Sequence, residues 1–561
     1  MSQTELSPVE GIKKRSNFLR GTLRESFADQ KTGAIAEDDL MIIKFHGSYQ
    51  QDDRDVREER RLQKLEPLYS FMLRARIPGG ICTPAQWLMF DRLATDYSNH
   101  TLRLTTRQTF QLHGVYKEQM KPVIQALVKD GLDSIAACGD VNRNVLSSPN
   151  PVAARVHKEV YDWAKAISEH LLPATRAYYE LWMDEKLVDG GEHEPIYGDT
   201  YLPRKFKTAV VIPPHNDTDV FANDLGFIAI IDGEKLLGFN VTVGGGMGTT
   251  HGDNETFPRL ADVLGFIKPD DTLKIAEAIL TTQRDWGNRS QRKLARLKYT
   301  LETHGVEAFK AEVEKRSGVK FDAARDFAFE HNGDRYGWIW GSDGYYHLTL
   351  FIENGRIADR GQHRLLTGLR EIAKIHHGDF RCTANQNVII ARVPANQKEQ
   401  IDALVKEYGL DLFETASKLR RESMACVALP TCTLAMAESE RYLPTLIDKL
   451  DAQFAAHGLS DETVVVRMTG CPNGCARPFL AEIGFVGKAL GRYNLYLGGN
   501  RAGSRLNKLF KENIDEATIL NTLDPLLARF ANEKFNGEGF GDFVVRTGII
   551  AAVKHGSEVH G

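Results

Sequence analysis

Two hydrophobic patterns alternate along this chain of 561 residues. Segments rich in Val, Ile and Phe predict β-strands, for example GFIAIIDGEKLLGFNVTVGGGMG from Gly226. Segments with apolar residues at helical spacing predict helices, as in PVAARVHKEVYDWAKAISEHLL from Pro151 and DTLKIAEAILTTQRDW from Asp271. The mixture of the two patterns indicates an α+β or α/β architecture.

The first 70 residues depart from this pattern. They are polar, show no clean amphipathic period and include the charge-dense run QDDRDVREERR. This composition predicts an N-terminal arm that binds a partner, with a solvated helical face as the plainer alternative.

After the arm, the chain approximately repeats itself. LRLTTRQTFQLHGV from Leu102 resembles FRCTANQNVIIARV from Phe380, and ACGDVNRNVLSSPNP from Ala137 corresponds to ACVALPTCTLAMAES from Ala425. The strand-like segment from Gly226 corresponds to GFVGKALGRYNLYLGGNRAG from Gly484. Three blocks in the same order predict a duplicated unit with a shared site where the halves meet; a chance alignment of strands is the alternative.

The segment from Leu102 carries an unusual set of polar residues. Read as one strand, it places six of them on one face: Arg103, Thr105, Arg107, Thr109, Gln111 and His113. The second copy has Arg381, Thr383, Asn385 and Asn387 there, so one cation is lost and the first half is expected to keep an anion-binding role. Further candidate cations are Arg74, Arg76, Arg143, Lys205 and Lys207. Each alone suits a surface residue, but cations within strand-like sequence together indicate an anionic ligand.

Four of the seven cysteines are clustered. Cys426 and Cys432 form C-x5-C, and Cys471 and Cys475 form C-x3-C. Four thiolates suit zinc or an iron–sulfur cluster, and C-x5-C is too long for a usual zinc knuckle, so the spacing favours the cluster. Zinc, or four unrelated buried cysteines, remain alternatives. The other three, Cys82, Cys138 and Cys382, are read as small buried hydrophobes.

Composition narrows the functional classes. The chain is 42% hydrophobic and 26% charged, and 71 Lys+Arg against 75 Asp+Glu give a net charge of −4, which argues against nucleic-acid or membrane partners. It shows no apolar run of signal-peptide or membrane-spanning length, so a cytoplasmic location is expected. The glycine runs GGGMG and NGEGFGD fit neither a dinucleotide-binding nor a P-loop motif and are read as turns. Electrons from a dinucleotide would therefore need another polypeptide.

Against this background, one segment carries a specific resemblance. TGCPNGCARPFLAEIGF is similar to the sirohaem and [4Fe-4S] signature of the sulfite and nitrite reductases at every fixed position, namely Thr469, Gly470, Cys471, Cys475, Glu482, Ile483, Gly484 and Phe485. FHGSYQQDDRD, RQTFQLHG, CGDVNRNV and YLPRKFK resemble the NADPH-dependent, flavoprotein-coupled branch of that family. The resemblance covers nearly the whole chain; Ser147 and Ser148 depart from it where relatives are expected often to carry a cysteine.

The resemblance implies a duplicated α+β nitrite/sulfite reductase fold with pseudo-two-fold symmetry. Its parts would be the arm (1–70), paired ferredoxin-like halves (71–136 and 338–412), a first sirohaem-binding domain (137–337) and a second, cluster domain (413–561). Cys426, Cys432, Cys471 and Cys475 would hold a [4Fe-4S] cluster, with Cys475 also bridging to the sirohaem iron.

The resemblance also implies roles for the polar residues. Sulfite would be bound by Arg74 or Arg76 with Arg143, Lys205 and Lys207, and sirohaem by Arg103, Thr105, Arg107, Gln111, His113 and Asn473. The implied reaction is the six-electron reduction of sulfite to sulfide in sulfate assimilation and cysteine biosynthesis. Electrons would come from NADPH through a separate flavoprotein (alpha) subunit carrying FAD and FMN in a large hetero-oligomer. A ferredoxin-dependent sulfite or nitrite reductase, a non-enzymatic iron–sulfur or tetrapyrrole carrier and a zinc-stabilised structural protein are the alternatives.

Overall fold

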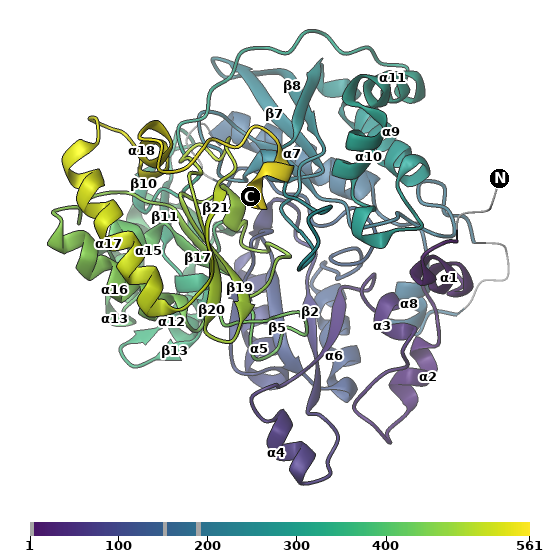
Figure 1. Ribbon diagram of the computed structural model, residues 1–561. Coiled ribbons are helices and arrows are strands. Elements are labelled where there is room, and N and C mark those ends of the chain that lie inside the picture. Colours follow the sequence, from purple (N-terminus) through teal and green to yellow (C-terminus); the bar gives the residue numbers. More distant parts are fainter. Residues whose placement is uncertain (1–4, 150–153, 187–191, 561) are drawn as a thin grey trace.

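The computed structural model describes residues 5–149, 154–186 and 192–560. Its strands form four main sheets, two of five strands in the ferredoxin-like region and two more in the larger lobes, together with a short two-stranded ribbon of β13 (Asp359–Arg360) and β14 (His363–Arg364). Figure 1 shows the two larger lobes on opposite sides of the molecule, with the N-terminal segments below and beside them.

The first two sheets exchange strands with each other. The first contains, in spatial order, β1 (Ser48–Asp52), β2 (Tyr69–Arg74), β5 (Phe110–Val115), β4 (Leu102–Leu104) and β12 (Arg356–Ile357). The second contains β10 (Gly337–Trp340), β11 (Tyr346–Leu350), β16 (Val388–Val393), β15 (Asp379–Cys382) and β3 (Ile81–Cys82). Each sheet therefore ends in a strand from the other half, β12 in the first and β3 in the second.

The third and fourth sheets follow one plan. The third contains β6 (Thr208–Val211), β7 (Leu225–Asp232), β8 (Lys235–Val243) and β9 (Asp262–Ile267). The fourth contains β17 (Ser423–Ala425), β18 (Val466–Thr469), β19 (Ile483–Ala489), β20 (Arg492–Leu497) and β21 (Lys508–Ile514). In both, a parallel pair (β6 with β7, β18 with β19) continues into antiparallel strands. In the parallel pairs, Thr208 lies opposite Leu225 and Val466 lies opposite Ile483. Residue 208 of the first lobe is therefore equivalent to residue 466 of the second, and residue 225 to residue 483.

Helices cover these sheets. In the half-domains they are α5 (Pro84–Tyr97), α6 (Met120–Lys129), α12 (Leu365–Ile375) and α13 (Lys398–Glu407). In the first lobe they are α7 (Ala154–His170), α8 (Ala177–Trp182), α9 (Thr272–Trp286), α10 (Leu297–His304) and α11 (Val306–Ser317). In the second lobe they are α14 (Leu412–Thr415), α15 (Lys418–Arg421), α16 (Leu443–Ala456), α17 (Glu516–Glu533) and α18 (Phe540–Arg546). One hydrophobic core runs through the half-domains and the first lobe, and a second core fills the second lobe.

An ion pair joins symmetry-related positions of the two lobes. Asp219 and Arg477 both adopt left-handed backbone and both precede a 3-10 turn, η3 (Val220–Ala222) and η8 (Pro478–Leu480). Arg477 donates to the Asp219 carboxylate, and Arg467 Nη1 donates to the same oxygen at 2.7 Å. All three side chains are buried, so loss of one would leave an uncompensated charge between the lobes.

The segment from Leu102 is a hairpin, so the prediction of one continuous strand is wrong. Between β4 and β5, the N–H of Thr105 donates to the Thr109 carbonyl at 2.9 Å, and Gln108 has φ 52°. The turn sequence TTRQT contains neither Gly nor Pro, so the sequence carries no usual sign of a reversal.

The second repeat block is also out of register in the sequence alignment. Leu146 forms a bridge with Ala209 of β6, and Met424 pairs in the same way with Arg467 of β18. Because Ala209 and Arg467 are equivalent positions, Leu146 is equivalent to Met424. Ser147 therefore corresponds to Ala425, and the expected match of Ala137 with Ala425 is wrong. The shared letters AC favoured the wrong register.

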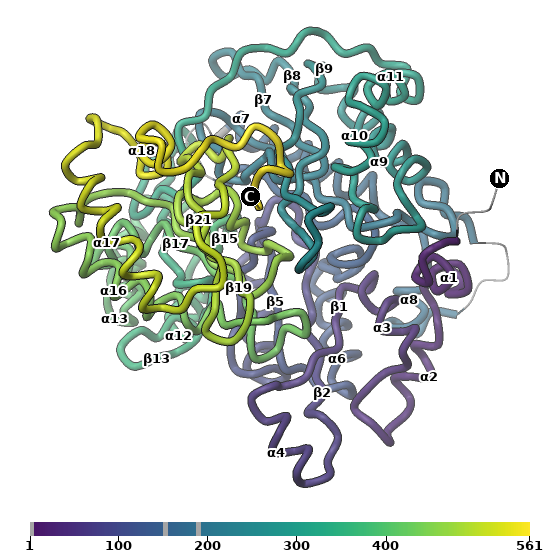
Figure 2. The backbone as a smooth tube through the Cα atoms, in the orientation of Figure 1, coloured from purple at the N-terminus to yellow at the C-terminus, as the bar shows by residue number. Residues whose placement is uncertain are grey.

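The N-terminal segment is built into the body rather than detached from it. β1 pairs with β2, so the expected boundary at residue 70 falls inside a strand. In α1 (Pro8–Arg15), the buried Lys13 ammonium donates to the Leu202 carbonyl at 2.7 Å. The further helices are α2 (Leu23–Ala28), α3 (Asp39–Ile42) and α4 (Arg57–Leu62). Of these only α4 has no buried residue, and Figure 2 shows it standing out from the lower edge of the molecule.

Candidate functional site

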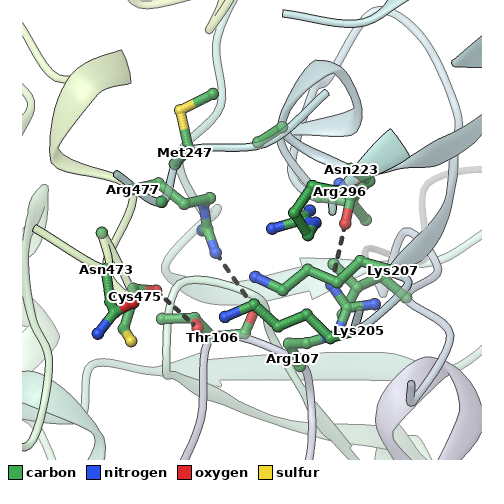
Figure 3. Close-up of a pocket in the computed structure, with 15 residues that line it drawn as sticks. Thr106, Arg107, Lys205, Lys207, Asn223, Met247, Arg296, Asn473, Cys475 and Arg477 are labelled. Carbon is green, nitrogen blue, oxygen red and sulfur yellow. Dashed lines mark hydrogen bonds between the residues drawn. The ribbon is translucent and has the colours of Figure 1, made fainter. Parts of the chain in front are cut away.

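A polar cavity lies where the hairpin tip meets both lobes. The hairpin contributes Thr106 and Arg107, and the first lobe contributes Lys205, Lys207 and Arg296 among others. The second lobe contributes Asn473, Gly474, Cys475 and Arg477. Figure 3 shows the two lysine side chains extended side by side toward the part of the cavity that contains Cys475. A cavity therefore lies at the junction of the halves, where the sequence predicts a shared site.

Lys205 and Lys207 are cations without a local counter-ion. Among the described residues, no acceptor forms a hydrogen bond or ion pair with either ammonium group. Burial, together with the Arg204 and Arg296 guanidinium groups, lowers the pKa of Lys205 to about 7. Burial and the neighbouring Lys205 lower the pKa of Lys207 well below its ordinary value. Such a pair indicates a site for an anion, which would remove the mutual repulsion.

The lowered pKa of Lys205 predicts a pH-dependent stability. In the protein without bound groups, the unfolded lysine keeps its ordinary pKa of 10.5, so between pH 7 and 9 the unfolded state binds more protons and stability rises with pH. We expect Lys205→Met to reduce this gain by about 1–2 kcal/mol, measured by denaturant unfolding at both pH values. An equal gain in both proteins would contradict the assigned pKa.

The other expected cations of the cavity are held in fixed positions. Arg107 Nη1 donates to Asn223 Oδ1 at 2.9 Å, and its remaining donors reach the carbonyls of Asn144 and Thr208. Burial and the nearby Arg143 lower the pKa of Arg107 to about 9. Arg143 itself is buried and donates from Nε to the Gly139 carbonyl at 2.7 Å.

Arg74 and Arg76 point to different places. Arg74 Nη1 donates to Cys138 Sγ at 3.1 Å, and Cys475 is among the groups that raise the pKa of Arg74 against the lowering effect of burial. Arg76 instead forms a bidentate pair with Asp133, at 2.8 and 2.5 Å. Arg76 borders a separate groove, whereas Arg74 is the one of the two candidates that lies within electrostatic reach of Cys475.

The remaining hairpin residues lie behind the cavity. Arg103 pairs across the hairpin with Gln111, whose amide oxygen, in the orientation that satisfies it, accepts from Arg74 Nη2 at 2.5 Å. Arg103 Nε donates to Glu440 Oε2 at 2.8 Å, so that expected cofactor contact is an ion pair to the second lobe. The Thr105 hydroxyl accepts from the Arg107 N–H at 3.2 Å.

His113 is the exception among them. Both of its ring nitrogens are buried and have no hydrogen-bond partner in the described residues. Burial beside Arg356 and Arg103 holds the pKa of His113 well below its ordinary value. Buried polar atoms normally have a hydrogen-bond partner, so the two unused nitrogens of His113 indicate that a bound polar group supplies one.

The four clustered cysteines lie close to one another beside the cavity. The thiols of Cys426, Cys471 and Cys475 influence one another electrostatically, as do those of Cys432 and Cys426. Burial raises the pKa of Cys426, Cys432 and Cys471 to about 12, whereas Cys475 is exposed and lines the cavity. In the described chain, no three His, Cys, Asp or Glu side chains converge on a single metal ion.

Amide and side-chain donors face these sulfurs, which is the environment that an iron–sulfur cluster needs. The Gly470 N–H donates to Cys426 Sγ at 3.3 Å, and Asn473 Nδ2 lies 3.6 Å from Cys471 Sγ. Gly474 has φ 62°, and a Cβ there would lie 3.1 Å from the Met247 carbonyl. The donor set therefore fits a [4Fe-4S] cluster, and the lysines beside Cys475 fit an anionic ligand.

The equivalent place in the first lobe lacks the thiols. Ser148 occupies the position of Cys426, and its hydroxyl accepts from the Ile212 N–H at 3.0 Å as Cys426 accepts from Gly470. By the same equivalence of positions, the first lobe has Pro213 where the second has Cys471, and Asp217 where the second has Cys475. The duplicated fold therefore provides two similar frames, of which only the second has sulfur ligands.

Sequence reasoning missed several residues of the site. Arg296 lines the cavity and binds Asp224 through two hydrogen bonds, at 3.0 and 2.7 Å. Lys298 is buried and donates to the Gly248 carbonyl at 2.8 Å, which holds the GGGMG segment. That segment contacts the cysteine loop, since the Thr249 N–H donates to the Pro472 carbonyl at 2.9 Å. Only the run of glycines signalled this close approach, and it had been read as a turn.

Within the described residues, none of the helices has the length and hydrophobicity of a membrane-spanning segment.

Two protein-family models match parts of this chain. The family model described as nitrite and sulphite reductase 4Fe-4S domain matches residues 162–321. The nitrite/sulfite reductase ferredoxin-like half domain matches twice, at 63–130 and 341–408, which confirms the predicted duplication and fold class.

Relatives match over the full length. A Myxococcus xanthus protein named sulfite reductase (NADPH) hemoprotein beta-component is 63% identical, with 97% of each chain covered. A Shewanella denitrificans protein of the same name is 60% identical, with 100% of each covered. The solved structure of Mycobacterium tuberculosis NirA shares the fold with a TM-score of 0.79 at 24% identity, covering 96% of both chains.

Proposed function

Because this chain belongs to the nitrite and sulfite reductase family, we propose that it catalyses the six-electron reduction of sulfite to sulfide. The observation that carries the proposal is the cavity in which Lys205 and Lys207, without counter-ions, face the exposed Cys475 of a four-cysteine cluster. The full-length relatives carry the name of an NADPH-dependent enzyme, so NADPH is the proposed electron source.

Two groups would complete the site. Cys426, Cys432, Cys471 and Cys475 would hold the [4Fe-4S] cluster, and Arg107, Gln111, His113 and Asn473 would border the sirohaem, with Arg103 and Thr105 behind them. Bound together, these groups would supply the electrons and the iron at which sulfite loses its oxygens.

The chain's own residues would bind the substrate and supply protons. Lys205 and Lys207 line the cavity, while Arg143 and Arg74 lie within electrostatic reach of Lys205 and Cys475, respectively. Together these four residues would bind the sulfite dianion and stabilise negative charge during reduction. Lys205 has a pKa of about 7 without an anion, and a bound anion would raise it. The protonated ammonium would then donate a proton as each oxygen leaves as water. Arg76, paired with Asp133, would take no direct part.

The proposal extends to partners and organisation. We assign residues 1–70 to contact with a separate flavoprotein subunit carrying FAD and FMN, in a hetero-oligomer located in the cytoplasm. The functional units would be 71–136 with 338–412, then 137–337 and 413–561, with the first boundary moved ahead of β2 (Tyr69–Arg74).

The test is spectroscopic and catalytic. Protein purified from cells that make sirohaem should contain about five irons per chain, as one cubane and one haem iron require, and a tetrapyrrole spectrum that sulfite alters after reduction. It should form sulfide with NADPH and the flavoprotein. A colourless protein without labile sulfide would overturn the proposal, and turnover with reduced ferredoxin alone would favour the ferredoxin-dependent alternative.

A further inference from the structure

The turn that follows Cys432 lies at the molecular surface. Thr433 and Leu434 are exposed, the latter with 64% of its side chain accessible, and Cys432 is only half-buried. The Ala435 N–H donates to the Cys432 carbonyl at 3.1 Å, and the amides of Leu434 and Ala435 oppose the burial that raises the pKa of the Cys432 thiol. The short turn after Cys432 thus places two backbone amides near the Cys432 sulfur, while its outer side faces away from the protein core.

A single side chain from the N-terminal segment holds that outer side. Arg54 Nη1 donates to the Ala435 carbonyl at 2.8 Å and to the Cys432 carbonyl at 3.4 Å. Its own N–H donates to the Pro430 carbonyl at 3.4 Å. Arg54 therefore contacts the segment from Pro430 to Ala435 at three carbonyls, and the amides of Leu434 and Ala435 lie within that segment.

The neighbouring residues fix the same contact. Asp55 forms an ion pair with Arg441, at 2.5 Å, beyond the far end of the loop. On the inner side, the Glu440 N–H donates to the Cys426 carbonyl at 3.1 Å. The cysteine loop is thus held from within by the body and from outside by residues 54 and 55.

We propose that Arg54 is a positioning residue for the [4Fe-4S] cluster, which holds the Cys432 turn against the sulfur and places a positive charge next to a ligand. The inference rests on the proposed cluster. The positive charge of the Arg54 guanidinium group, beside the backbone of a ligand residue, would stabilise the more negative, reduced state of the cluster. Its hydrogen bonds to the turn would slow the opening that releases iron. The N-terminal segment, assigned above to partner contact, would then also bear directly on the electron-transfer centre.

The test compares Arg54→Met with Arg57→Met in the cofactor-loaded protein. Arg57 is a matched control, because it lies three residues further on and pairs with Asp52 at 2.7 Å without touching the loop. We expect Arg54→Met to shift the cluster midpoint potential to a more negative value, measured by EPR-monitored titration. It should also speed iron release to a chelator roughly tenfold. Arg54→Lys should recover the potential because it keeps the charge.

The outcomes distinguish the role of Arg54 from the proposed function of the protein. A cluster-loaded Arg54→Met protein whose potential and iron-release rate equal those of Arg57→Met would overturn the role of Arg54 and leave the proposed function standing. An unsubstituted protein that contains no labile sulfide would overturn both.

Discussion

Cys471→Ser protein is expected to contain neither labile sulfide nor the coupled spectrum, and to show no measurable sulfite turnover. Cys471 supplies a buried sulfur in the ligand set, with its loop packed between Met247 and the strands of the second lobe. A hydroxyl is a poor iron ligand and cannot replace the thiolate, as soft sulfur ligands are what such clusters select. Iron and sulfide analysis measures the loss directly.

Cys82→Ala is the matched control for that experiment. Cys82 is equally buried, but it lies in β3 within the hydrophobic core and outside the cysteine group. It should retain full iron content and activity. Equal loss of iron in both variants would show that the effect of Cys471→Ser is a general folding defect, and full iron in Cys471→Ser would refute the ligand assignment.

Lys207→Met is expected to lower kcat for sulfite by about 10²–10⁴-fold while the cofactor spectrum is kept. The reason is that Lys207 touches no acceptor in the described protein, so its ammonium group is not needed for the fold. A bound anion would raise its lowered pKa, and the protonated group would then serve the substrate. Activity with reduced methyl viologen isolates this step from electron delivery by the partner.

Lys121→Met provides the comparison for the lysine experiment. Lys121 is exposed and pairs with Asp184 far from the cavity, so the same substitution should leave kcat unchanged. If Lys207→Met loses the tetrapyrrole spectrum as well, its role is cofactor binding alone. If it keeps normal turnover, the assignment of Lys207 to substrate binding and proton supply is wrong.

The sequence predicted the composition of the site better than its geometry. The cysteine spacing and signature located four residues that the fold brings together, because those residues lie in two loops that follow the neighbouring parallel strands β17 and β18. The side chains of Arg74 and Arg76 could not be separated from sequence, since only the partner Asp133 shows which one points away. The direction of Arg103 likewise depends on Glu440, more than 300 residues away along the chain.

The errors have specific physical causes. The turn at Gln108 adopts positive φ without a glycine, so the alternating pattern of Leu102–His113 appeared continuous. The importance of the GGGMG segment lay in contacts with the other lobe, which local sequence does not encode. The polar composition of the N-terminal segment predicts exposed charges, but Lys13 is buried and donates to the carbonyl of Leu202. A partner so distant along the chain is not evident from local sequence.

The exchange of β3 and β12 has a consequence for how the protein is made. Neither ferredoxin-like sheet is complete until the other half has been synthesised, because β12 begins at Arg356 and completes the sheet that β4 and β5 started. Pairings so distant along the chain form late and slowly. A ribosome must therefore release well over half of the polypeptide before the first sheet can close, and the cysteine loops emerge later still. Loading of the proposed cluster and macrocycle would on this account be a post-translational event, carried out on a nearly finished fold.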